Sequence, residues 1–136
     1  MKLSNFREDL EKHEKGTPIY IQDACFWLRR FGTDASNKAV RKIKQSLYGI
    51  NPDPKEVSEM EVYAHWLIEF GLVDWTGVYD EDNNKLECTA RSTRQVFSND
   101  EYWGSGGLVH QLIAEALNYE NFLHEEMEED VEAVKK

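Results

Sequence analysis

One segment, from Asp53 to Gly71, constrains the fold more than any other, because it combines helix boundary signals with apolar residues on several faces. Asp53 can cap a helix, Pro54 suits its first position, and Glu56 completes a capping box. Gly71 suits the end of the helix. The apolar residues between these signals include Met60, Val62, Ala64, Trp66, Leu67, Ile68 and Phe70. A helix that is apolar on several faces is buried, so we predict that it is the central element of the fold.

The remaining segments predict an α+β fold that is predominantly helical, with four to five helices and two short β-hairpins. The hairpins are predicted at residues 17–31 and 75–89, where β-branched and aromatic residues flank turn residues. Capping residues and apolar spacing predict further helices at residues 5–14, 34–48 and 89–97, and from residue 106 onward.

A chain of 136 residues has the size of one domain. We predict that residues 1–122 form a single globular domain and that residues 123–136 form an acidic tail, which is flexible or becomes helical on binding. The predicted structural core of the domain contains Trp66, Leu67, Phe70 and Trp75. Trp75 lies in a strand-like segment, and we expect its ring to pack near Trp66 or Phe70.

An acidic stretch, DEDNN at residues 80–84, has the alternating oxygen ligands of a calcium-binding loop. The sixth position of such a loop needs Gly and the twelfth needs Glu, but Lys85 and Arg91 stand there. Asp and Asn also suit the turn of a hairpin, because they tolerate turn geometry and bond their own backbone. We therefore predict that the stretch is a turn, and we expect no metal site in it.

The chain contains no motif that indicates catalysis. Residues 104–107, GSGG, have the glycines of a phosphate-binding loop but neither its Lys nor its spacing. Cys25 and Cys88 are not in a metal-binding spacing, and His65 suits a half-buried position in the central helix better than a ligand position. We expect a protein that is not an enzyme and needs no cofactor, with an enzyme that uses paired carboxylates as one alternative.

The formal charge of the chain is −10, and this charge is unevenly distributed. Residues 25–55 contain seven Lys or Arg and two Asp, whereas residues 56–136 contain 19 acids and five bases. An acidic protein repels phosphate, so we expect no nucleic-acid partner. The basic helix at 34–48 is interpreted as a solvated face, or as a surface complementary to acidic residues of the same chain or of another copy.

The expected location is the cytoplasm. Residues 1–10 are charged throughout, which is not typical of a secretory signal peptide. No apolar run approaches the roughly 20 residues that span a bilayer, so we expect no membrane association. Two cysteines are too few for the disulfide framework of a small secreted protein.

A series of short motifs follows one order between residues 17 and 125. WLRRF at 27–31 ends the first predicted hairpin, and the acidic turn follows the strand-like segment after the central helix. The other motif residues are Leu72, Trp75, Gly77, Val78, Leu86, Thr89, Ala116 and Phe122. In their order and spacing these motifs resemble the tail assembly chaperones of long-tailed bacteriophages.

The resemblance implies a role in binding rather than catalysis. Proteins of that family bind the tape measure protein, tail tube subunits or both in the host cytoplasm. They keep these proteins soluble until the tail polymerises, and they are absent from the mature virion. The alternative is an acidic phage-encoded inhibitor or DNA mimic that binds a host protein, although such a mimic would spread its acids over a whole face.

Two sets of aromatic and apolar residues are candidates for partner binding. Tyr102 and Trp103 lie in a loop, where we expect them to be exposed. A second set continues the apolar spacing of the last helix into the acidic tail and would present a stripe to a partner helix: Tyr119, Leu123, Met127, Val131 and Val134. The alternative for this stripe is a solvated tail that binds nothing. The sequence leaves homo-oligomerisation open.

Overall fold

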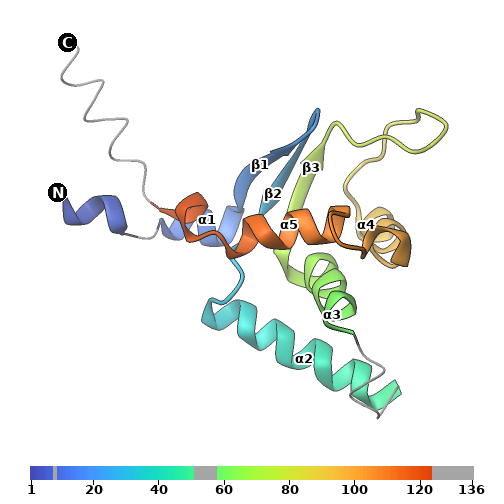
Figure 1. The fold of residues 1–136 in the computed structure, drawn as a ribbon, viewed down its shortest axis with the longest axis horizontal. Coiled ribbons are helices and arrows are strands. Elements are labelled where there is room, and N and C mark those ends of the chain that lie inside the picture. Colours follow the sequence, from blue (N-terminus) through green and yellow to red (C-terminus); the bar gives the residue numbers. More distant parts are fainter. Residues whose placement is uncertain (8, 51–57, 124–136) are drawn as a thin grey trace.

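The computed structural model describes residues 1–7, 9–50 and 58–123 (Figure 1). Its helices and strands follow in the order α1 (Leu10–Lys15), β1 (Thr17–Ile21), β2 (Ala24–Leu28), α2 (Asp34–Ile50), α3 (Glu59–Trp66), β3 (Leu72–Thr76), α4 (Ala90–Phe97) and α5 (Leu108–Leu117). Short 3₁₀ helices lie at Leu3–Phe6, Asp100–Tyr102 and Tyr119–Phe122, and a π-helical turn lies at Leu67–Gly71. These elements confirm the predicted α+β class.

The three strands form one antiparallel sheet in the order β1-β2-β3. Ile19, Phe26 and Trp75 stand opposite one another in successive strands, and all three side chains are buried. Tyr20 points to the other face and is 76% exposed. Alternate residues of a strand face opposite sides of a sheet, so one face of this sheet packs on the helices. The other face is more exposed, although Cys25 on it is buried.

The second predicted hairpin, at 75–89, is wrong in its pairing. β3 pairs with β2 instead. The return segment, which follows the turn at residues 80–84, forms one isolated bridge, between Tyr79 and Lys85. Two backbone hydrogen bonds flank this bridge, since the N–H of Leu86 donates to the carbonyl of Val78 and the N–H of Asp80 donates to the carbonyl of Asn84, each at 2.9 Å. The indole Nε1 of Trp75 also donates to the carbonyl of Leu86, at 2.8 Å. The first hairpin is confirmed, with its turn at Gln22 and Asp23.

The central helix is shorter than predicted. α3 begins at Glu59, where the side chain of Ser58 accepts a hydrogen bond from the backbone N–H of Glu61 at 3.1 Å. The cap predicted at Asp53 lies outside the described residues. The helix ends in the π-helical turn at Gly71, where a Cβ would overlap the ring of Trp66. Gly71 is therefore needed for close packing, and the chain continues from it directly into β3.

The predicted core residues are largely buried. Trp66 and Leu67 are fully buried and Trp75 is 3% exposed, as predicted, whereas Phe70 is half-buried at the edge of the core. The ring partners of Trp75 are Phe26 and Phe97, with ring centroids 6.4 Å away in both cases. The expected packing of Trp75 near the central helix is replaced by packing within the sheet and on α4.

The two ends of the described chain lie together. The helix predicted at 5–14 is divided, because Arg7 is extended between the first 3₁₀ helix and α1. Two backbone carbonyls near the other end accept hydrogen bonds from this region: Thr17 Oγ1 donates to Asn121 and the N–H of Asp9 donates to Phe122, each at 3.0 Å. Phe122 is fully buried, so the segment after α5 belongs to the packed structure.

Candidate functional site

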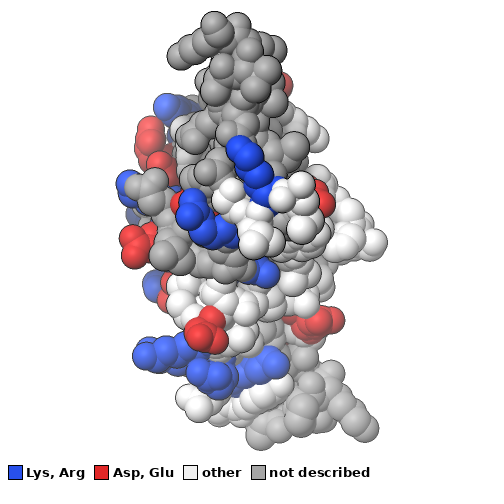
Figure 2. Space-filling view, turned by 90° about the vertical axis from the view of Figure 1, so that its left-hand side faces the viewer, with Lys and Arg blue, Asp and Glu red and all other residues white. Residues whose placement is uncertain are grey.

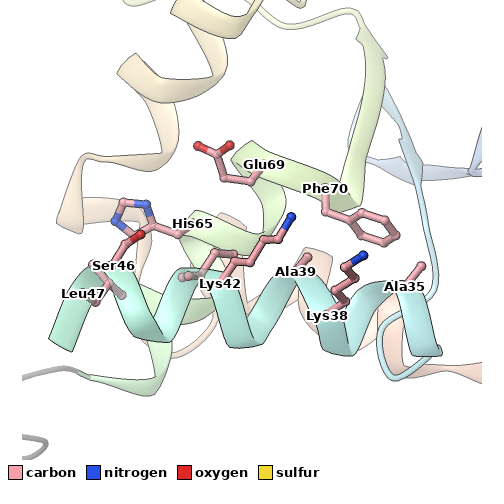
Figure 3. Close-up of a pocket in the computed structure, with 10 residues that line it drawn as sticks. Ala35, Lys38, Ala39, Lys42, Ser46, Leu47, His65, Glu69 and Phe70 are labelled. Carbon is pink, nitrogen blue, oxygen red and sulfur yellow. The ribbon is translucent and has the colours of Figure 1, made fainter. Parts of the chain in front are cut away.

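A groove of about 690 Å³ lies between α2 and the segment formed by α3 and the π-helical turn (Figure 3). α3 lies between α2 and the sheet, so α2 is the outermost helix at this end of the molecule (Figure 1). The groove is lined by Ala35, Lys38, Ala39, Lys42, Ile43, Ser46, Leu47, His65, Glu69 and Phe70. All of these residues belong to α2, α3 or the π-helical turn.

Helix α2 is attached to α3 by a buried hydrogen bond near its first turn. The indole Nε1 of Trp66 donates to Ser36 Oγ at 3.0 Å, and both residues are fully buried. The backbone N–H of Gly32 donates to the same oxygen at 3.2 Å. This contact sets the separation of the two helices, and the small side chains of Ala35 and Ala39 leave space between them further along.

The groove has apolar walls that solvent can reach. Ala39, Leu47 and Phe70 are half-buried, and each packs against the core with one part of its surface. The ring of Phe70 also lies under the guanidinium of Arg29, 4.9 Å from the ring centroid. An exposed apolar surface inside a concavity favours the burial of an apolar partner, at about 25 cal/mol per Å² removed from water.

Lysines stand along the rim of the groove. Lys38 and Lys42 are exposed and rise from α2 toward the turn that carries Glu69 and Phe70 (Figure 3). Glu69 is the acid on this rim, and its Oε1 lies 3.9 Å from Nη2 of Arg94. In a second view Lys and Arg side chains gather at the lower end of the molecule, over α2 (Figure 2). The groove is therefore a locally cationic surface on an acidic chain.

The predicted loop residues differ in their exposure. Tyr102 is 37% exposed, in agreement with the prediction. Trp103 is half-buried against the core, and its indole Nε1 donates to the carbonyl of Phe97 at 2.8 Å, so the expectation that it is exposed is wrong. Trp103 holds the loop to the end of α4. Neither residue lines the groove.

The predicted apolar stripe is interrupted. α5 ends at Leu117, and Asn118 is extended and caps the next turn by accepting from the N–H of Glu120. Tyr119 is 54% exposed but lies beyond the helix, so it does not share a helical face with the residues of α5. Leu123 is half-buried, and its carbonyl accepts a hydrogen bond from Lys12 at 3.0 Å. Met127, Val131 and Val134 lie outside the described residues.

The acidic stretch at 80–84 is a turn, as predicted. Asp80 Oδ1 accepts hydrogen bonds from the backbone N–H groups of Asp82 and Asn84, at 2.9 and 2.8 Å. Asn83 adopts a φ of 63°, which Asn tolerates better than most residues. One carboxylate thus closes the turn by accepting from its own backbone. Among the described residues, no group of three or more His, Cys, Asp or Glu is placed to hold a metal ion.

The two cysteines lie beside the sheet rather than in the groove. Cys25 is buried in β2, and Cys88 is half-buried just before α4. Burial raises the pKa of both thiols, and the negative charge of Asp74 adds to this effect in each case. A raised pKa keeps a thiol protonated and lowers its nucleophilicity near neutral pH.

Sequence reasoning did not find the groove. The basic residues of α2 are interpreted from the sequence as a solvated face or as a surface complementary to acidic residues, and two of them, Lys38 and Lys42, line the groove. The available signal was the repeat of Ala35 and Ala39 at a four-residue spacing beside two Lys with the same spacing. Residues four apart share a helix face, so small and basic residues alternate along one edge of α2.

The chain was compared with models of protein families, with curated proteins and with solved structures, and no match was found in any of the three comparisons. Within the described ranges, no helix is long and apolar enough to cross a bilayer.

Proposed function

We propose that this protein is a tail assembly chaperone of a long-tailed bacteriophage, which acts in the host cytoplasm. Its clients are the tape measure protein, tail tube subunits or both, and it keeps them soluble until the tail polymerises. It does not enter the mature virion. The motif order given above supports this proposal, and the structural observation that carries it furthest is the groove beside α2.

The groove has the chemistry that an apolar helical client needs. Amphipathic helices bind by laying their apolar face into a hydrophobic groove. Here Ala39, Leu47 and Phe70 provide half-buried apolar contacts, and Lys38 and Lys42 can pair with acids beside the apolar face of the client. The net charge of −10 would keep the complex soluble, because copies of a strongly charged protein repel one another.

The test is co-expression with the tape measure protein of the same phage, followed by separation of soluble and insoluble fractions. We expect the intact chain to move the tape measure protein into the soluble fraction and to remain bound to it in a pull-down. The proposal would be contradicted if the tape measure protein and the tail tube subunit, each co-expressed with the chain in turn, both stayed insoluble or were soluble without being bound to it.

A matched pair of variants tests the groove itself. Ser46 and Gln45 are neighbours on α2 and both are exposed, but only Ser46 lines the groove. Ser46→Trp should fill the groove and lower the yield of soluble client several-fold, whereas Gln45→Trp should behave as the parent does. Equal yields for the two variants would place the client elsewhere on the surface.

A further inference from the structure

The groove beside α2 runs along the axis of that helix. Its lining residues on α2 recur at three- and four-residue steps from the first turn to the last: Ala35, Lys38, Ala39, Lys42, Ile43, Ser46 and Leu47. Residues at these steps share one face of a helix, so the groove is a stripe parallel to α2. At 1.5 Å per residue this stripe is roughly 18 Å long. An elongated occupant of the groove therefore lies along α2 rather than across it.

The walls of the groove favour an occupant that satisfies its own backbone hydrogen bonds. α2 forms one wall, and α3 with the π-helical turn forms the other. Helical walls offer no free row of backbone N–H and C=O groups, which an extended peptide needs when it leaves water. A helix pairs its own backbone groups and presents only side chains. The small side chains of Ala35 and Ala39 also let a second helix approach α2 closely, so the occupant that fits is a helix.

The two walls of the groove differ in charge. Lys38 and Lys42 rise from α2 (Figure 3), and within the described ranges neither of them forms an ion pair with a carboxylate. Glu69 stands on the opposite wall, but its Oε1 lies 3.9 Å from Nη2 of Arg94, which balances its charge. Opposite charges a few ångströms apart attract even at a solvated surface. The groove therefore favours a helix with acids on the side that faces α2.

The spacing of the two lysines determines the spacing of those acids. Lys38 and Lys42 are four positions apart on one helix, which separates them by about 6 Å along its axis. A helix that lies along α2 has the same rise per residue, so two of its acids meet both lysines when they are also four positions apart. The whole chain carries a charge of −10 and repels acids at long range. Acids elsewhere on the bound helix therefore do not assist binding.

We infer that the groove is specific for an amphipathic helix that lies along α2 and carries two Asp or Glu, four positions apart beside its apolar stripe, which pair with Lys38 and Lys42. The apolar stripe packs against half-buried residues of the walls: Ala39, Leu47 and Phe70. This inference rests on the proposed function only for the identity of this helix as part of a client. Electrostatic complementarity contributes more to specificity than to affinity, so the lysines select the helix and the apolar walls hold it.

Fluorescence anisotropy of the full chain with synthetic peptides tests this inference. The first probe is an amphipathic peptide of Leu, Ala and Gln, about four turns long, with two Glu four positions apart at the edge of its Leu stripe. The second probe has the same composition but carries the two Glu on the face opposite the stripe. We expect the first probe to bind roughly tenfold more tightly, because only its acids reach the lysines and two exposed ion pairs contribute modestly.

Two pairs of substitutions locate the bound probe. Lys38→Glu with Lys42→Glu reverses both charges on the groove wall and should weaken the first probe by about tenfold or more. A third probe, with Lys in place of the two Glu, should then bind this variant more tightly than it binds the parent. Arg41→Glu with Lys44→Glu is the matched control, because both residues are exposed on α2 outside the groove and the net charge changes equally. The control should weaken the first probe by less than about threefold at physiological salt, where charges more than about 8 Å apart are largely screened.

Three results would overturn the inference. The first is equal binding of the first two probes, or no binding of either. The second is an equal loss of binding in the two substituted pairs. The third is a dimer of the chain alone in sedimentation velocity that Lys38→Glu with Lys42→Glu dissociates and the control pair does not, which would assign the groove to a second copy.

The two proposals fail separately. If the first probe binds as expected but neither tail protein is held in co-expression, the proposed function is wrong and the specificity of the groove stands. If a tail protein is solubilised and bound but the chain does not distinguish the first two probes, the specificity is wrong and the proposed function stands.

Discussion

The hydrogen bond between Trp66 and Ser36 gives a sharp prediction for stability. Trp66 Nε1 donates to Ser36 Oγ at 3.0 Å, and neither residue is exposed to solvent. Ser36→Ala leaves the indole N–H buried without an acceptor, which costs about 1–3 kcal/mol. The N–H of Gly32 loses the same acceptor, but Gly32 is exposed and water can replace it. We expect Ser36→Ala to lower the free energy of unfolding by about 1–3 kcal/mol.

Urea unfolding followed by circular dichroism measures this loss without relying on tryptophan fluorescence. Ser46→Ala is the matched control at an exposed position of α2, and it should change the free energy of unfolding by less than about 0.5 kcal/mol. In a Trp66→Phe background, where the donor is absent, Ser36→Ala should cost much less, because residues in contact are energetically coupled. An equal cost in both backgrounds would refute the assigned hydrogen bond.

Three further outcomes are expected. Trp75→Ala should lower the free energy of unfolding by about 3–5 kcal/mol in urea titrations, as large-to-small core changes do, and the variant should keep client binding. Burial and a hydrogen bond to Glu59 raise the pKa of Tyr63 to about 12. The raised pKa therefore increases the free energy of unfolding relative to Tyr63→Phe. This gain is fully present below pH 10 and is lost as the pH rises through 12. Urea unfolding of both proteins at pH 9–12 measures it. Iodoacetamide should modify Cys88 before the more buried Cys25, and both rates should rise with pH because the pKa of each thiol is raised, as peptide mapping over time can measure.

The features that were correctly predicted depend on short stretches of sequence. Asp80 closes its turn through the backbone N–H groups that follow it, so the chemistry of five residues was sufficient. Trp66 and Leu67 are buried because the segment around them is apolar on several faces. In both cases residues that are neighbours in sequence determine the local structure, and segments distant in sequence only add contacts to it.

The wrong predictions depend on partners that are distant in sequence or on competition between two local signals. β3 pairs with β2, far back along the chain, rather than with the segment after the turn. Trp103 is half-buried because its indole N–H donates to the carbonyl of Phe97 and its ring packs against the core. Asn118 ends α5 where the apolar spacing alone predicted that the helix continues, since its side chain caps the following turn. The groove needs α2 and α3 at a fixed separation, which no local pattern specifies.

The hydrogen bonds between the first and last described segments set an order for folding during synthesis. Thr17 and Asn121 are 104 positions apart, and bringing two such points together in a flexible chain costs roughly 4 kcal/mol plus a constant. This cost is recovered only when Phe122 is buried, so the contacts form after residue 122 has left the ribosome. A nascent chain of this protein must hold its N-terminal hairpin without these partners for most of its translation. Ribosome-bound chains arrested before residue 118 should therefore be much more sensitive to protease around residues 9–17 than the released protein.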